Sequence, residues 1–354
     1  MVRILSINPG STSTKIALYE DEAPLFVETI RHSAEEIGQF RRIVDQYGFR
    51  RDVILRVLEE KGVELKTLAV VVGRGGVLPP IASGVYRVNE RMLEDLRSPG
   101  REHVSNLGPF LAREIASQVG IPAFIVDPVS VDEFEPIARI SGLPEIERKS
   151  FSHALNMKAA ARKAAKQLGR PYGELNLVVV HMGGGISVSP HRKGRMIDVN
   201  QALDGTGPFS PERAGGLPIG DLVRLAYSGK YTYEQLYRRL VGGGGLVAHL
   251  GINDAREVER RIAAGDEHAR LVYEAMAYQI AKEIGAMATV LKGEIDTIVI
   301  TGGLAHSEML TGWVRERVEW IAPVLIFPGE DEMEALTLGA LRALRGEEEP
   351  KEYS

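Results

Sequence analysis

A turn rich in hydroxyl groups interrupts the first apolar run of the chain. Residues 2–8 read as a buried strand, which breaks at the segment Asn8–Lys15 (NPGSTSTK) before a second strand begins. A hairpin requires only two turn residues, so this turn carries more polar chemistry than a change of direction needs. Its glycine lets backbone N–H groups come close to an anion, because no Cβ blocks the approach.

Two further glycine-rich turns follow predicted strands, in LVVVHMGGGISVS (177–189) and TIVITGGLAHSEML (297–310). A single Gly-Gly turn is more often only a hairpin or a helix cap. Three turns at similar positions favour a site for a polyphosphate. The P-loop pattern G-x-x-x-x-G-K-[ST] does not occur, and no G-x-G-x-x-G follows a strand, which argues against a dinucleotide site.

The periodicity of apolar residues predicts the elements that carry these turns. We expect strands at 2–8, 15–20, 24–30, 67–73, 121–127, 175–181, 185–190, 195–199, 294–301 and 323–327. We expect helices at 34–61, 90–97, 105–119, 152–168 (with Ser152 as N-cap), 220–241, 254–292, 306–321 and 332–345. Each half begins with three closely joined strands and then alternates helices with strands. This order predicts two α/β domains of like topology, 1–150 joined by the C-terminal helix 332–354, and 151–331.

Composition excludes several classes of protein. The net charge of −5 and the absence of a Lys/Arg run argue against a nucleic-acid partner. The chain has no cysteine, which excludes disulfides, thiol nucleophiles and zinc–thiolate sites. Its first apolar stretch is too short for an export signal, and no apolar run reaches the roughly 20 residues that cross a bilayer. We therefore expect a cytoplasmic protein with no membrane partner.

Two of the turns carry the signatures of a known family. The pattern N-x-G-S-[ST]-[ST]-x-K at Asn8–Lys15 resembles the first signature of the acetate and butyrate kinase family, and H-x-G-x-G-x-S at His181–Ser187 resembles the second. The stretches VVVGRGGVLPPI, REHVSNLG and DGTGPFSPERAGGLP are most similar to butyrate kinases. The resemblance covers essentially the whole chain. It implies the duplicated βββαβαβα domains of the actin, sugar-kinase and chaperone-ATPase fold, with the active site in a cleft between them.

The resemblance implies reversible phosphorylation of a short-chain carboxylate by ATP, with Mg²⁺ as a second cofactor and a homo-oligomer as the assembly. Butyrate is the expected substrate, and acetate, propionate or a branched-chain carboxylate are the alternatives. A carboxylate is already a nucleophile, so the site needs cations and N–H donors more than a base. A sugar kinase, by contrast, needs an aspartate base for its hydroxyl acceptor. A rival of another class is an actin-like ATP-binding protein without catalysis, which the fold alone does not exclude.

The family motifs also imply which residues bind phosphate and metal. The N-terminal domain is the carboxylate and γ-phosphate side, and the C-terminal domain is the nucleotide side. The implied phosphate- and nucleotide-binding residues are Asn8, Gly10, Ser11, Ser13, Lys15, Gly183, Gly184, Gly185, Gly302 and Gly303. Strand alternation could instead turn Lys15 away from the site. Asn8 and either Glu334 or Glu332 match the magnesium-linked positions, although acidic residues in a first helical turn are also favoured by the helix dipole.

The implied catalytic residues are two arginines, two histidines and an aspartate. His181 matches the active-site histidine, the alternative being a satisfied core histidine. Arg74 stands at the histidine of the family's V-H-G-G, while Val71 stands where an arginine is usual, and we expect Arg74 to hold the carboxylate with its fork-shaped guanidinium. The family's second arginine is missing from 216–221, so Arg213 is the predicted substitute.

Two further positions match the family less closely. His103 is either catalytic or a helix cap. Asp127 is expected to orient an arginine or to hold Mg²⁺ through water.

Two small residues suggest the size of the acyl group. Acetate kinases usually have Phe before the active-site histidine and Val before the histidine of V-H-G-G, where this chain has Val180 and Gly73. Both differences remove side-chain volume. We therefore predict an acyl pocket at Gly73 and Val180 with room for butyrate.

Overall fold

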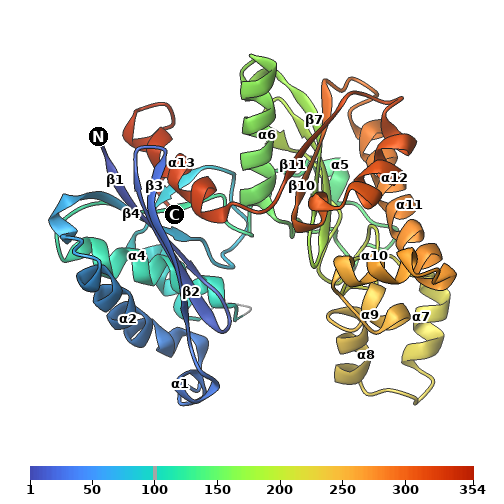
Figure 1. Cartoon of the computed structure of the whole chain (residues 1–354), viewed down its shortest axis with the longest axis horizontal. Helices are drawn as coiled ribbons and strands as arrows, with labels where there is room; N and C mark the ends of the chain where they lie inside the picture. Colours follow the sequence, from blue (N-terminus) through green and yellow to red (C-terminus); the bar gives the residue numbers. More distant parts are fainter. Residues whose placement is uncertain (99–101) are drawn as a thin grey trace. The chain divides into compact units, whose positions relative to one another are not determined.

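The computed structural model describes residues 1–98 and 102–354 (Figure 1). Arg101, the first residue of the REHVSNLG stretch, lies outside the described residues. The chain forms two compact units, here called the first unit (Met1–Val131 with Asp331–Ser354) and the second unit (Asp132–Glu330). The sequence placed the division near residue 150. Residues 132–150 instead group with the second unit, where Phe134 and Ala138 pack on Val199.

The first unit is a six-stranded sheet with helices on it. Its elements are β1 (Arg3–Pro9), β2 (Ser13–Glu20), β3 (Ala23–Arg31), α1 (Ala34–Gly38), α2 (Tyr47–Glu60), β4 (Leu68–Arg74), β5 (Val85–Arg87), α3 (Glu90–Arg97), α4 (Leu107–Ser117), β6 (Ala123–Val126) and α13 (Glu332–Leu344). The strand order is β3-β2-β1-β4-β6-β5. Strands β1, β2 and β3 are antiparallel neighbours, whereas β1, β4 and β6 run parallel.

Both faces of this sheet are covered, and strand alternation decides which residue faces which helix. Along β1, Ile7 belongs to the core cluster that includes α2, α3 and α4. Ser6 points the other way, and its Oγ lies 2.7 Å from Oγ1 of Thr337 on α13. Helix α13 also contacts β4 and β6, so the last helix of the chain packs on the strands of the first unit, as Figure 1 shows.

The second unit repeats this arrangement. Its elements are α5 (Pro136–Arg139), α6 (Ala154–Leu168), β7 (Asn176–Met182), β8 (Ile186–Arg192), β9 (Arg195–Met196), α7 (Ile219–Ala226), α8 (Tyr233–Leu240), α9 (Gly245–Leu250), α10 (Ala255–Ala263), α11 (Glu267–Val290), β10 (Thr297–Gly302), α12 (Glu308–Val318) and β11 (Val324–Pro328). The strand order is β11-β10-β7-β8-β9. Again three antiparallel strands join two parallel ones, which confirms the predicted duplicated α/β fold.

The start of α6 differs from the prediction. The helix begins at Ala154, with His153 rather than Ser152 at the N-cap position and no side-chain cap bond. The Oγ atom of Ser152 is buried and has no hydrogen-bond partner among the described residues. Throughout the described ranges, no helix has both the length and the apolar character that crossing a membrane requires.

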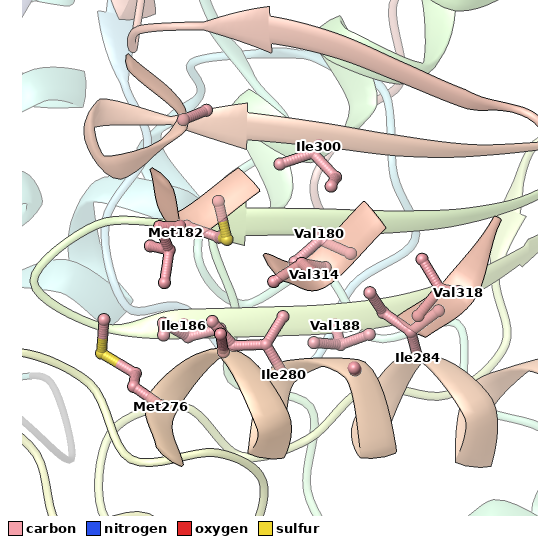
Figure 2. Close-up of a cluster of buried hydrophobic side chains, with 14 of the residues drawn as sticks. Val180, Met182, Ile186, Val188, Met276, Ile280, Ile284, Ile300, Val314 and Val318 are labelled. Atoms are coloured by element: carbon pink, nitrogen blue, oxygen red, sulfur yellow. The ribbon is translucent and has the colours of Figure 1, made fainter. Parts of the chain in front are cut away.

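Val180 lies in the main core of the second unit. Figure 2 shows Val180, Met182 and Val188 of β7 and β8 facing Ile280 and Ile284 of α11. Val180 is completely buried there. Because successive residues of a strand point to opposite faces, Val180 and His181 lie on different sides of the sheet. The small size of Val180 is thus accounted for by core packing.

Replacing Val180 with Phe is therefore expected to overpack this core. Such changes usually cost about 1–3 kcal/mol of stability, so V180F should lower the midpoint of thermal unfolding. Val27→Phe on β3 is the matched control, because Val27 is 47% exposed and has room for a ring. A V180F protein as stable as V27F, with a changed preference among carboxylates, would contradict this packing role and restore the acyl pocket.

Candidate active site

The polar residues of the first unit meet at one edge of its sheet. Strands β1, β4 and β6 are parallel, so their carboxyl ends lie together, a usual position for ligand sites in α/β sheets. Asn8 stands near the end of β1, Arg74 ends β4, and Asp127 directly follows β6. The first turn of α13 comes to this edge as well, because Glu332 contacts Asn8 and Arg74.

Glu332 links the predicted arginine and asparagine. Its Oε1 lies 2.5 Å from Nη1 of Arg74, and its Oε2 accepts a hydrogen bond from Nδ2 of Asn8. The side chains of Arg74 and Glu332 keep 24% and 17% of their exposure, so this ion pair is partly shielded from water. The Oδ1 atom of Asn8 is buried without a hydrogen-bond partner among the described residues. The first unit therefore holds a guanidinium, a carboxylate and an unused amide oxygen together.

These oxygens suit the magnesium ion that the family implies. Mg²⁺ prefers oxygen ligands and is usually held by one or two carboxylates together with substrate phosphates. Asn8 Oδ1 and the Glu332 carboxylate meet that requirement. For Glu334, the other predicted ligand, the structure gives a different neighbour: burial, together with the charges of Asp331 and Glu334, raises the pKa of Tyr19 to about 12. In the described ranges, no group of three or more acidic, histidine or cysteine side chains could hold a metal on its own.

Lys15 lies on the same face of the sheet as Asn8. The register pairs Asn8 of β1 directly with Lys15 of β2. The predicted alternative, in which alternation turns Lys15 away, therefore receives no support. In the turn between these strands, Ser11 is exposed, and the backbone N–H of Gly10 donates to the carbonyl of Ser13 at 2.7 Å.

Asp127 and His103 make local contacts. Oδ1 of Asp127 accepts hydrogen bonds from Oγ of Ser83 and from the backbone N–H of Gly84, both at 2.8 Å. Asp127 is 1% exposed and has a left-handed backbone with φ of 38°, which is uncommon outside glycine. His103 caps the short 3₁₀ helix Val104–Asn106, since its Nδ1 accepts from the N–H of Ser105 at 3.2 Å. Of the two roles predicted for His103, the structure displays the capping one.

Gly73 is explained by packing against α4. It neighbours Arg74 on β4 but faces the opposite side of the sheet, where a Cβ would overlap the backbone carbonyl of Gly108. A Cβ on Gly108 would in turn overlap the carbonyl of Arg74. Only glycines permit this close approach of strand and helix. The acyl pocket predicted at Gly73 therefore gains no support from the contacts of this residue.

The second unit brings its two glycine turns together at one sheet edge. Strands β7 and β10 are parallel and pair His181 with Thr301, so the turns that follow them are neighbours. Gly302 has φ of 99°, and a Cβ there would overlap the carbonyl of Met182. This contact joins the 183–185 turn to the 302–303 turn.

Arg213 also lies at this edge, although many residues separate it in sequence from the 183–185 turn. Its guanidinium lies where a Cβ of Gly185 would be, and its Nη1 donates to the carbonyl of Ala202 at 2.6 Å. Ser210 connects the two segments, because its Oγ donates to the carbonyl of Gly184 at 2.6 Å. The structure thus assembles His181, Gly183, Gly184, Gly185, Arg213, Gly302 and Gly303 in the second unit.

Two residues of this cluster were missed by sequence reasoning. His153, just before α6, stacks on His181 with ring centroids 4.1 Å apart, and its Nδ1 lies 2.9 Å from Oγ of Ser187. Glu330 approaches Nε2 of His181 to 3.3 Å and accepts from the N–H of Gly303 at 3.4 Å. A carboxylate oxygen therefore lies among the glycine turns. His153 could have been found from the sequence, because it is a histidine just before a predicted helix. No sequence pattern marks Glu330.

Replacing His181 with Ala should lower kcat by about 10²-fold while leaving the protein folded. His181 is 1% exposed, and its Nδ1 has no partner among the described residues, which suits a donor awaiting a ligand. His191→Ala is the matched control, since His191 is also buried, lies near the far end of the neighbouring strand β8, and has its Nδ1 2.8 Å from the hydroxyl oxygen of Tyr172. H191A should lose stability but not kcat per folded molecule. Collapse of the H181A circular dichroism spectrum would mark His181 as structural.

Comparisons with known proteins agree with this fold. Residues 146–320 match the model of the acetokinase family. The solved structure of Porphyromonas gingivalis acetate kinase aligns over 98% of this chain and 100% of that chain, with a TM-score of 0.80 and 19% identity. A propionate kinase from Francisella tularensis subsp. tularensis SCHU S4 aligns over 96% and 99%, with a TM-score of 0.76 and 18% identity.

Acetate kinase from Entamoeba histolytica is a third similar structure, with a TM-score of 0.76, 15% identity, and 95% and 98% of the two chains covered. At such identities the structures show a common fold. The family model supplies the closer relation, because it matches the region that contains the second signature and the clustered residues of the second unit. Residues 146–320, just under half of the chain, therefore carry a similarity to the acetokinase family, and the first signature at Asn8–Lys15 points to the same family.

Proposed function

We propose that this protein transfers the γ-phosphoryl group of ATP to a short-chain carboxylate and forms an acyl phosphate, with butyrate as the preferred substrate. The match of residues 146–320 to the acetokinase family supports a carboxylate phosphotransferase. The preference for butyrate rests on the stretches around Arg74, His103 and Arg213 that resemble butyrate kinases. Acetate, propionate and branched-chain acids are the alternative substrates.

The Arg74–Glu332 pair is the observation that carries this proposal. It provides a partly exposed guanidinium at the carboxyl end of a parallel strand. A guanidinium fork binds a carboxylate through two parallel hydrogen bonds. A sugar kinase would instead need a free carboxylate base at this edge. Of the carboxylates described there, Glu332 is paired with Arg74, and Asp127 is buried and accepts from Ser83 and Gly84.

In the proposed reaction, one carboxylate oxygen attacks the γ-phosphorus and forms the new P–O bond. The bond to the β–γ bridging oxygen breaks, and its electron pair leaves with ADP. No proton has to be removed, so the protein contributes positioning and charge neutralisation. Arg74 holds the carboxylate, the Asn8–Lys15 turn and His181 donate to the phosphoryl oxygens, and the 183–185 and 302–303 turns bind the nucleotide.

Magnesium would neutralise charge on the phosphates, with Asn8 Oδ1 and Glu332 as its protein oxygens. Glu332 would then be shared between the cation and Arg74. The carboxylate of Glu332 also restrains the position of the Arg74 guanidinium.

Trapping the acyl phosphate with hydroxylamine tests the proposal. Carboxylates of two to five carbons are supplied with ATP and Mg²⁺, and hydroxamate is measured against a reaction without carboxylate. We expect product with several acids and the highest kcat/KM with butyrate. Two buried methylenes contribute about 1–2 kcal/mol, or close to tenfold, over acetate. A maximum at acetate would limit the proposal to a general carboxylate kinase.

The actin-like alternative gives a different outcome in the same experiment. A protein that only binds ATP would show nucleotide binding by calorimetry and no hydroxamate with any acid. Release of ADP with sugars but not with carboxylates would indicate a sugar kinase.

A further inference from the structure

Arg50 is a buried arginine behind the Asn8–Lys15 turn. It lies on α2, is 0% exposed, and is the largest of the fully buried side chains in the described part of the chain. Buried arginines are normally paired with carboxylates, because an uncompensated buried charge is costly. Across residues 1–98 and 102–354, Arg50 forms no ion pair within 4.0 Å of a carboxylate. Its partners are neutral.

Most of these partners belong to the turn itself. Nη1 donates to the carbonyls of Gly10 at 2.8 Å and Ser13 at 2.9 Å, and to Oγ1 of Thr14 at 3.1 Å. Nη2 donates to the carbonyl of Ser11 at 3.3 Å. On the side of α2, Oε1 of Gln46 accepts from Nη2 at 2.9 Å and from Nε at 3.2 Å.

These bonds orient the backbone of the turn. The carbonyl of Thr12 accepts from the N–H of His32 at 2.9 Å, so all four carbonyls from Gly10 to Ser13 bond groups of the protein. The N–H groups of Ser11 and Thr12 have no acceptor within the described part of the chain. A turn with bound carbonyls and unused N–H groups presents donors to an anion.

The charge of Arg50 persists at neutral pH. Burial lowers the pKa of Arg50 to about 10, which still leaves the guanidinium protonated. An anion bound at the turn would therefore accept hydrogen bonds from the free N–H groups and would be attracted by the positive charge of Arg50 behind them.

We infer that Arg50 is a positioning residue for the transferring phosphoryl group: it fixes the turn with its N–H groups available and supplies a positive charge that only the bound anion neutralises. The identity of that anion as the γ-phosphoryl rests on the proposed function. Arg50 acts through the turn and is not itself a catalytic residue.

Gln46→Glu separates the charge from the geometry. It places a carboxylate where the amide oxygen already accepts from Nη2 and Nε, so the fork stays in place while its charge is neutralised. We expect kcat to fall about tenfold, the KM of the carboxylate to stay within twofold, and the unfolding temperature to be equal or higher. Gln39→Glu, at an exposed position of the same unit, controls for added negative charge. Wild-type kcat in Q46E would overturn the role of the charge.

Arg50→Lys tests the fork, since lysine keeps the charge but reaches fewer of the carbonyls. We expect kcat to fall about 10²-fold, and added guanidinium ion to restore part of the activity of Arg50→Ala. Arg148→Lys is the matched control, because Arg148 also bonds backbone carbonyls and Asp198 but belongs to the second unit. Equal losses of kcat per folded molecule in R50K and R148K would overturn the inference. If R50K does not fold, Q46E decides it.

Hydrogen exchange separates this inference from the proposed function. Tripolyphosphate should protect the amides of residues 11–13 in the wild type and protect them several-fold less in Q46E. A wild type that makes no hydroxamate but shows this protection would reject the carboxylate kinase and retain the role of Arg50. Equal protection in both proteins, or none in either, would reject the inference.

Discussion

Arg74→Ala is expected to lower kcat by 10²–10³-fold while changing the affinity for ATP by less than threefold. The loss of one preorganised donor to a transition state is typically worth about 3–4 kcal/mol. Arg74 belongs to the carboxylate side of the reaction, so nucleotide binding by the glycine turns of the second unit should persist. Hydroxamate formation gives kcat, and calorimetry gives the dissociation constant of ATP.

Arg87→Ala is the matched control for this variant. Arg87 lies on β5 of the same unit and pairs with Glu352 at 3.4 Å, with both side chains about half exposed or more. Exposed ion pairs contribute little, so R87A should behave as wild type. If R74A keeps kcat within threefold of R87A, Arg74 is only a turn residue, and the carboxylate must be held elsewhere.

Gly73→Val should unfold the first unit or destabilise it by more than about 4 kcal/mol. The new side chain would meet the backbone of Gly108, and a backbone atom cannot move aside as a flexible side chain can. Losses of this size are exceptional for single substitutions and point to a specific clash. Thermal unfolding, with soluble yield as a second measure, reports the effect.

Gly48→Ala on α2 shows what an added methyl does where there is space. No atom lies within 4 Å of a Cβ at this position. Alanine also restricts the unfolded chain more than glycine, so G48A should match or slightly exceed wild-type stability. A folded G73V protein with an increased preference for short acids would instead support the acyl pocket predicted at Gly73.

The repeated order of strands and helices was predictable because both sheets consist of long, regular apolar runs. Elements that depend on tertiary contacts were missed. β5 is three residues long and is held by pairing with β6. The helix expected at 34–61 is divided into α1 and α2 by a 3₁₀ turn. The pattern of apolar residues did not predict this division, because it does not reveal the local capping bonds at Ser33 and Arg42.

The candidate site was predictable where a motif stands at a strand end, as with Asn8, His181 and the glycine turns. It was not predictable where a partner is distant in sequence. Arg50 reaches the first signature from about 40 residues away and lies in no glycine turn. Glu332 was predicted only as one of two glutamates, and its contacts with Asn8 and Arg74 were not. At Val180 the sequence shows a small residue but not which face of its strand it occupies, and the structure places it in the core of the second unit. The acyl pocket there stays a prediction.

The return of α13 to the first unit has a consequence for the order of biosynthesis. Ser6 on β1 bonds Thr337, and Tyr353 is buried and donates to Asp95. Residues 132–330 are continuous in sequence and can fold as soon as they leave the ribosome, whereas the earlier-made β1 must wait for residues 331–354. During translation the oldest strands of the protein therefore have one face without its helix. We expect chaperones to engage the nascent first unit for longer than the second.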